Sequence, residues 1–155
     1  MPDMLVKLYD LPDSAPVYAA LAEQGITIKR VMTPNYNVVT DWIRTHFSDG
    51  WACEAGSAVY RQPSGLFVAV CGKEILGFAA CNATAKDYFG PTGVLESARG
   101  KGIGRALLLR ALEALREEGY AYAIIGGVGP QEFYRKACGA ILIPDSSPGI
   151  YSDLL

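Results

Sequence analysis

TGVLESARGKGIGRALLLRALEALR, residues 92–116, is the stretch that decides the fold expected for this chain. A short apolar run leads through a glycine-rich turn into a long amphipathic segment, so the pattern predicts a strand, a loop and a helix. The loop contains three glycines: Gly100, Gly102 and Gly104. Three positive side chains flank them: Arg99, Lys101 and Arg105. Since glycines let backbone N–H groups approach a ligand closely, and a helix N-terminus adds unpaired donors, the stretch predicts a phosphate or pyrophosphate site.

Two familiar phosphate-binding loops do not fit this spacing. A P-loop requires Ser or Thr after its Gly-Lys pair, but Lys101 is followed by Gly102, and no glycine stands five residues before Gly100. A dinucleotide-binding fingerprint requires Gly or Ala at a position that holds either Leu107 or Arg105 here, depending on the starting glycine. The loop is therefore expected to belong to a different class.

Residues 99–104, RGKGIG, match the pattern Arg/Gln-x-x-Gly-x-Gly/Ala at every fixed position, and so resemble the pyrophosphate loop of the GNAT acyltransferases. Further along, residues 133–140, FYRKACGA, resemble the tyrosine- and glycine-containing motif near the end of the same family, with Tyr134 and Gly139 in place. A helix and an apolar strand candidate separate the two motifs, which is the family's order of elements. The resemblance covers roughly residues 26 to 145.

The resemblance implies an α/β (α+β) fold with a mixed, mostly antiparallel central sheet of about six to seven strands and helices on both faces. Residues 1–155 are expected to form a single domain, in which a strand-helix extension over residues 1–25 precedes a core over residues 26–155. It also implies that acetyl-CoA is the co-substrate.

In the family, the strand before the loop separates from its neighbour and binds the pantetheine arm through free backbone groups. The resemblance therefore assigns cofactor binding to that strand and to the loop: Thr92, Gly93, Val94, Arg99, Gly100, Lys101, Gly102, Ile103, Gly104 and Arg105. It assigns to Tyr134 the catalytic acid that donates to the thioester sulfur. Many members carry Asn where this chain has Gly127, so that contact with pantetheine is expected to be lost or replaced. Ala140 stands where Phe is usual.

The general base stays open between Glu96, Asp87, His46 and water, because none of these residues stands at a diagnostic spacing. The segment between the first two core strands is expected to shape the acceptor site. It supplies aromatic residues that either line a pocket or pack the helices onto the sheet: Trp42, Phe47, Trp51 and Tyr60. It also supplies acids that either attract a cationic amine or are simply solvated: Asp41, Asp49 and Glu54.

Hydrophobic periodicity and turn residues predict the remaining elements. Strands are expected over residues 4–9, 26–32, 66–70, 74–81, 88–95, 121–125, 141–143 and 150–155. Helices are expected over residues 14–24, 38–47, 51–60 and 105–118, and in a short segment that carries Phe133 and Tyr134. Gly72 and Lys73 are expected to form a hairpin turn, and Ser48-Asp49-Gly50 a break between two helices.

Composition limits the classes of partner and compartment. Fourteen Lys and Arg stand against 16 Asp and Glu, and the net charge of −2 disfavours nucleic acid or an anionic membrane as a partner. The four cysteines are dispersed without a C-x-x-C pair, which disfavours a metal site and predicts reduced, buried thiols. With neither a signal-like segment nor a long apolar run, the expected location is the cytoplasm.

The first functional hypothesis is an N-acetyltransferase that moves an acetyl group directly from acetyl-CoA to a primary amine of a small molecule or protein. The alternative is a non-catalytic acyl-CoA-binding regulatory module, which the unidentified base and the missing Asn favour. A phosphate-binding regulator of another fold is a third hypothesis. The apolar ends, residues 4–9 and 150–155, suggest a homodimer.

Overall fold

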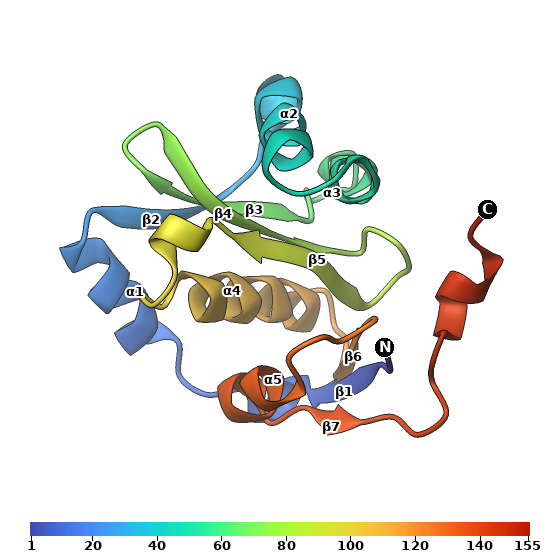
Figure 1. Ribbon diagram of the computed structural model, residues 1–155. Coiled ribbons are helices and arrows are strands. Elements are labelled where there is room, and N and C mark those ends of the chain that lie inside the picture. Colours follow the sequence, from blue (N-terminus) through green and yellow to red (C-terminus); the bar gives the residue numbers. More distant parts are fainter.

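The computed structural model describes residues 1–155 and contains a seven-stranded sheet in the order β2-β3-β4-β5-β6-β1-β7 (Figure 1). The strands are β1 (Met4–Lys7), β2 (Ile26–Arg30), β3 (Leu66–Cys71), β4 (Glu74–Cys81), β5 (Tyr88–Val94), β6 (Tyr122–Ile125) and β7 (Ile141–Leu142). Every neighbouring pair is antiparallel except β5 and β6, which are parallel. The predicted mixed, mostly antiparallel sheet is thus confirmed.

Helices cover both faces of this sheet, as the sequence predicts. They are α1 (Ala15–Glu23), α2 (Tyr36–His46), α3 (Asp49–Val59), α4 (Ile103–Glu117) and α5 (Gln131–Cys138), and short 3-10 turns occupy Leu8–Asp10, Thr33–Asn35, Glu96–Ala98 and Gly149–Asp153. Figure 1 shows α2 and α3 on one face of the sheet, and α1 and α4 on the other. None of the helices combines the length and the hydropathy that a membrane span requires.

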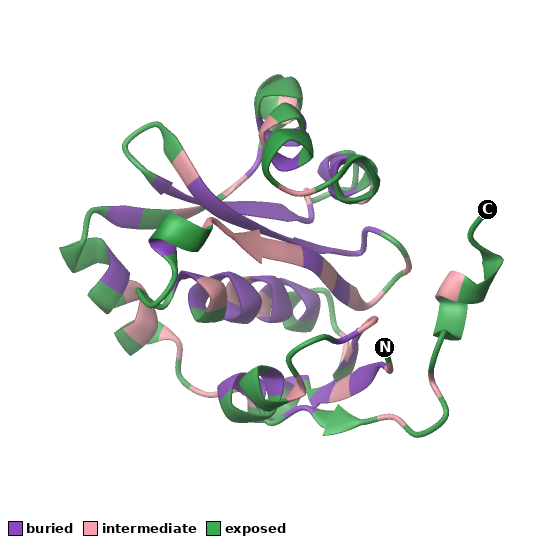
Figure 2. Ribbon diagram, in the orientation of Figure 1, coloured by how far each residue is buried: buried purple, intermediate pink, exposed green.

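Two hydrophobic cores lie on opposite faces of the sheet, and strand β3 contributes to both. Leu66, Val68 and Val70 pack with residues of α2 and α3, whereas Phe67 and Ala69 pack with residues of α4. Successive side chains of a strand point to opposite faces, so an uninterrupted apolar run suits a strand that is covered on both sides. Figure 2 shows buried residues along these central strands and on the sheet-facing side of α4.

Helix α4 is the long amphipathic helix predicted after the glycine-rich loop. It begins at Ile103, two residues before the predicted start. Gly102 has a positive φ of 89° and is the last residue of the irregular loop before the helix. Leu108, Leu112 and Leu115 are buried, as expected from their spacing along one face. The helix thus fixes the loop against the sheet.

Three local predictions are corrected by the structure. Helix α3 starts at Asp49 because the side chain of Ser48 accepts a hydrogen bond of 3.1 Å from the N–H of Trp51, so residues 49 and 50 belong to the helix rather than to a break. The strand predicted over 150–155 is wrong, since Gly149–Asp153 forms a 3-10 turn with a hydrogen bond from Tyr151 N–H to the carbonyl of Pro148. Of the four cysteines, two are exposed rather than buried: Cys53 and Cys71.

Strands β5 and β6 separate soon after they meet. They pair only at Tyr88 with Ile124 and Phe89 with Ile125, and the next residue, Gly90, has a φ of 118°. Strand β5 continues to pair with β4 on its other side as far as Val94. Beyond Phe89, the edge of β5 that faces β6 therefore has no strand partner, and its backbone polar groups are free to bind a ligand.

Candidate functional site

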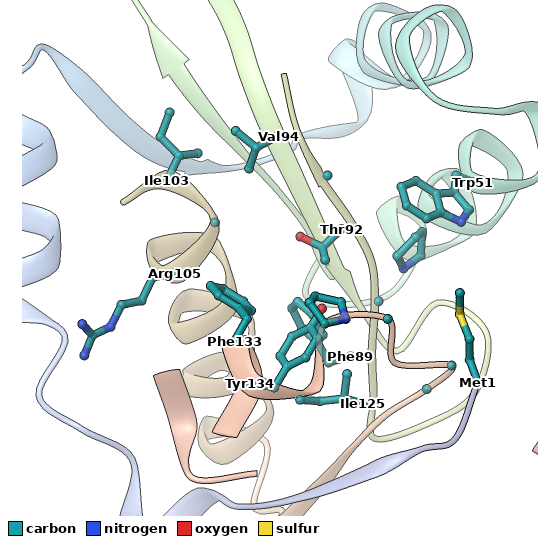
Figure 3. A pocket seen from close by; sticks show the side chains of 18 of the residues that line it. Met1, Trp51, Phe89, Thr92, Val94, Ile103, Arg105, Ile125, Phe133 and Tyr134 are labelled. Atoms are coloured by element: carbon teal, nitrogen blue, oxygen red, sulfur yellow. The ribbon is translucent and has the colours of Figure 1, made fainter. Parts of the chain in front are cut away.

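A cavity of about 1100 Å³ opens where β5 and β6 separate (Figure 3). Its walls come from β5, the glycine-rich loop, the first turn of α4, the end of β6, α5 and α3, together with residues near both ends of the chain. It brings together most of the residues assigned from the sequence: Thr92, Gly93, Val94, Arg99, Gly100, Gly102, Ile103, Gly104, Arg105 and Tyr134. Lys101 does not line the cavity, and its side chain is exposed.

The glycine-rich loop presents a row of free backbone donors to this cavity. The N–H groups of residues 100–105 donate to no backbone carbonyl or side chain of the protein, and the first helical bond is from Ala106 N–H to the carbonyl of Gly102. Unpaired amides at a helix N-terminus attract anions through both hydrogen bonds and the helix dipole. Arg99 and Arg105 add two positive side chains that line the cavity.

Glycine is required in this loop by backbone conformation rather than by packing. Gly100 and Gly102 have φ values of 81° and 89°, yet a Cβ at either position would meet no atom within 4 Å. A Cβ at Gly104 would lie 3.7 Å from Val94 and 3.9 Å from Phe133, which are ordinary contacts. The fold itself therefore leaves room above these glycines, as an anion that contacts the backbone requires.

Gly93 on β5 is held differently. A Cβ there would lie 2.5 Å from a carbon of the Phe47 ring, so the packing of α2 against the sheet excludes a side chain at this position. The neighbouring Thr92 uses its hydroxyl to donate a 3.0 Å hydrogen bond to the carbonyl of Phe78. Gly93 can therefore offer only its backbone groups to a ligand at the free edge of β5, and the Thr92 hydroxyl proton is already used within the protein.

Tyr134 projects from α5 into the middle of the cavity, where Figure 3 shows it beside Phe89 and Phe133. Its ring packs edge-on against both, with centroid distances of 6.2 Å to Phe89 and 5.1 Å to Phe133. The hydroxyl makes no hydrogen bond within the protein and is not sealed from the cavity. Burial, with a smaller contribution from Cys138, raises the pKa of Tyr134 to about 12, so the phenol stays protonated and can donate.

The three candidate bases lie outside this cavity. His46 and Glu96 line a second cavity of about 760 Å³, beside Phe47 and the end of β5. Asp87 lies in the connection between β4 and β5, where one of its carboxylate oxygens is buried without a hydrogen-bond partner. Burial, and then the charge of Glu118, raise the pKa of Asp87 to about 6. None of the three thus lines the cavity that holds Tyr134.

The aromatic residues of the helical pair divide between the two interpretations left open by the sequence. Trp51 lines the large cavity and Phe47 the second one. The other two pack against neighbouring rings, Trp42 on Phe78 and Tyr60 on Tyr36. Among the three acids, Glu54 alone lines the large cavity.

Two glycines at the end of β6 accommodate residues that the sequence did not place at the site. A Cβ at Gly126 would lie 3.0 Å from the Tyr88 ring and 3.4 Å from the Tyr151 hydroxyl, and one at Gly127 would lie 3.5 Å from the Tyr151 ring. The N–H of Gly127 donates a 2.8 Å hydrogen bond to the buried Asp3 carboxylate. Where Asn is expected by resemblance, this chain thus has a bare backbone against which Tyr151 packs. In the sequence, the pair Gly126-Gly127 is the one feature that indicates close packing of a ring at this position.

Comparison with known proteins identifies the family. The family model described as "Acetyltransferase (GNAT) family" matches residues 32–140, and the chain belongs to this family. The predicted resemblance is thereby confirmed. Membership supports an acyltransferase activity in general, with acetyl-CoA as the co-substrate. A search of curated proteins found no match.

Solved structures share the fold at low identity. One is the glucosamine N-acetyltransferase region of a fungal multi-domain GH3 β-N-acetylglucosaminidase, with a TM-score of 0.75 and 16% identity, covering 92% of this chain and 19% of that one. A GCN5-related N-acetyltransferase from Sphaerobacter thermophilus has a TM-score of 0.71 and 21% identity, covering 92% and 48% respectively. An aminoglycoside acetyltransferase from an uncultured soil sample has a TM-score of 0.56 and 15% identity, covering 74% and 88%. The chain thus spans less than half the length of the first two.

Proposed function

We propose that this protein is an N-acetyltransferase that transfers an acetyl group from acetyl-CoA directly to a primary amine. The observation that carries the proposal is one continuous cavity that joins the amide-rich loop, the free edge of β5 and the Tyr134 hydroxyl. The loop amides, with Arg99 and Arg105, suit the pyrophosphate. The free backbone groups after Phe89 suit the amides of the pantetheine arm, which would direct the thioester toward Tyr134.

The proposed reaction forms one C–N bond and breaks one C–S bond. A neutral amine attacks the thioester carbonyl carbon, and the tetrahedral intermediate collapses with release of the thiolate of CoA. The nitrogen loses one proton and the sulfur gains one, so the products are the N-acetyl amine and CoA with a free thiol. Donation from the Tyr134 hydroxyl stabilises the negative charge that develops on sulfur. The raised pKa of Tyr134 keeps that donor protonated across the working pH range.

The alternative of a non-catalytic acyl-CoA-binding module keeps one specific observation in its favour. The three candidate bases, His46, Glu96 and Asp87, do not line the cavity that holds Tyr134. Such a module would bind acetyl-CoA through the same loop and β5 edge but would leave the thioester intact.

An acceptor-dependent assay of thiol release separates the two functions. The full chain is incubated with acetyl-CoA and a panel of primary amines, and free CoA thiol and acetylated amine are measured together. An acetyltransferase releases thiol and acetylated amine in equal amounts, and only when an acceptor is present. If acetyl-CoA binds but its thioester survives every amine in a broad panel, the binding module is the better account.

A further inference from the structure

The large cavity has two ends of opposite chemical character. Figure 3 shows Arg105 and Ile103 at one end and Trp51 and Met1 at the other, with Tyr134 between them. The first end carries the positive side chains and free amides of the loop. At the second end, Glu54 is the single carboxylate among all the residues that line the cavity. An anion thus suits one end of the cavity, and a cation the other.

The Glu54 carboxylate forms no ion pair within the protein and is therefore able to bind a cationic ligand. It lies three residues after Trp51 on α3, so the two side chains share one face of the helix. The hydroxyl of Thr84 donates a hydrogen bond to one oxygen, Oε2, while Oε1 accepts none, and no Lys or Arg forms an ion pair with the carboxylate. A partly buried carboxylate with a free oxygen gains from a cationic donor.

Tyr151, in the C-terminal segment, also lines this end of the cavity near Glu54. Burial is the main cause that raises its pKa, a hydrogen bond with Thr84 lowers it, and the nearby charge of Glu54 raises it. The ring packs against Gly126 and Gly127 at the end of β6. Thr84 and Tyr151 are more than sixty positions apart in the chain, yet Thr84 donates to Glu54 and Tyr151 lies near both residues.

Apolar side chains form most of the rest of this end. The Trp51 ring stacks on Phe47 at a centroid distance of 5.6 Å and an interplanar angle of 29°. Pro148 and the Met1 side chain also line the wall. Aromatic faces beside a single lining carboxylate favour a ligand with one positive charge and an apolar body.

We propose that Glu54, Trp51 and Tyr151 form the acceptor subsite, and that it takes a compact primary monoamine whose apolar body packs on the two rings. The amine binds Glu54 as an ammonium group and loses one proton to water before its neutral nitrogen attacks the thioester. This inference rests on the proposed acetyl transfer, because it names the substrate class of that same cavity. Tyr151 lies outside residues 32–140, so the subsite belongs partly to a segment that the family match does not cover.

Binding of a probe amine tests the subsite without requiring turnover. The full chain is saturated with CoA, which cannot transfer an acetyl group, and is titrated calorimetrically with 2-phenylethylamine. Glu54→Gln keeps the side-chain shape and an acceptor for Thr84 but removes the charge, so it should weaken binding by about tenfold or more. Asp41→Asn, an exposed acid on α2, should change nothing. Equal affinity in the Glu54→Gln variant and the wild type would overturn the subsite.

A ligand series on the wild-type chain tests the charge without any variant. The first analogue, 2-phenylethanol, is uncharged, and the second, phenylalanine, is a zwitterion with an added carboxylate. Each should bind at least about tenfold more weakly than 2-phenylethylamine. If either binds as tightly as the amine, the proposed role of Glu54 is wrong. This series remains decisive even if Glu54→Gln fails to fold.

Thiol release with acetyl-CoA separates failure of this inference from failure of the proposed function. Binding of 2-phenylethylamine that depends on Glu54, without acetylation of any amine, would leave the subsite standing and contradict the acetyltransferase. Acetylation of other amines with equal efficiency by wild type and Glu54→Gln would keep the acetyltransferase and overturn the subsite. Acetylation of 2-phenylethylamine with a raised amine KM and an unchanged acetyl-CoA KM in Glu54→Gln would support both.

Discussion

The two ends of the large cavity are built by different means. The loop end consists of consecutive residues whose backbone N–H groups face the ligand, and its shape depends on the positive φ angles of Gly100 and Gly102. The acceptor end consists of side chains from α3, the β4–β5 connection and the C-terminal segment. A backbone site of this kind leaves a local pattern in the sequence, whereas a side-chain site is assembled only by the tertiary fold.

The largest expected effect breaks the loop end alone. Gly102→Glu places a carboxylate among the free amides and forces a side chain onto a φ of 89°, so acetyl-CoA affinity should fall by about a hundredfold. Gly72→Glu is a matched control, because Gly72 has a φ of 61° with equally open space but lies in the β3–β4 hairpin. Calorimetric titration of both variants with acetyl-CoA measures the two affinities. A similar loss in both would mean that the effect comes from general destabilisation.

The next effect concerns the middle of the cavity. Tyr134→Phe removes the donor proposed for the sulfur and keeps the ring that packs on Phe89, so kcat should fall about tenfold to a hundredfold with acetyl-CoA affinity nearly unchanged. Steady-state rates measured under conditions where product release is not limiting provide the test. Tyr60→Phe, at an exposed tyrosine that directly follows α3, should keep full activity. Full turnover of Tyr134→Phe would remove Tyr134 from the chemistry.

A third change tests whether Gly93 is constrained by packing rather than by a ligand. Gly93→Ala drives a Cβ to 2.5 Å from the Phe47 ring, so the free energy of unfolding should fall by about 2 kcal/mol. Gly50→Ala, in α3 with nothing within 4 Å, should be neutral or stabilising by about 0.5 kcal/mol. Denaturant unfolding of both variants measures the difference. Equal stabilities would show that the helix pair can yield at Gly93.

The smallest effect concerns Asp87, which lies outside the cavity. Because the folded pKa is raised to about 6, the folded state holds a proton that the unfolded chain loses near pH 4, and stability should fall as pH rises between these values. Asp87→Asn should flatten this slope and stabilise the protein at pH 7 by about 1 kcal/mol, a value reduced for solvent screening at this partly exposed residue. Turnover should be unchanged, so a large loss of activity would restore Asp87 as a base.

Asp145→Asn is the matched control for that change. Asp145 also has a positive φ, of 56°, but it is exposed, so its substitution should leave the pH dependence of unfolding as it is. Denaturation midpoints measured from pH 4 to pH 7 for both variants provide the comparison. A change of slope in both would assign the effect to the left-handed backbone rather than to the buried oxygen.

The sequence predicted the parts of the fold that depend on local patterns. The period of α4, the continuous apolar run of β3 and the glycines around residue 102 are all encoded within a few neighbouring positions. Splitting of β5 from β6 was predicted only by resemblance, and the pairing of the two strands confirms it. The observed start of a helix differs from the predicted one where a capping side chain sets it, as Ser48 does for α3.

The acceptor end could not be predicted in the same way. Glu54 was one acid among three on the helix pair, and its place in the cavity wall and its hydrogen bond from Thr84 distinguish it. Residues 150–155 have an apolar pattern that favours a strand, but Pro148 and Gly149 redirect the chain into a 3-10 turn that brings Tyr151 to the cavity. Contacts between residues so far apart in the chain produce no regular spacing pattern from which they could be predicted.

Whether the large cavity is an acetyl-CoA site can be measured by calorimetric titration of the ligand-free, folded protein with acetyl-CoA, NAD and ATP at one ionic strength. Acetyl-CoA should bind saturably, and NAD and ATP should bind at least about tenfold more weakly, because only the pantetheine arm can pair with the free edge of β5. Equal affinity for the three ligands, or no binding of acetyl-CoA, would contradict it.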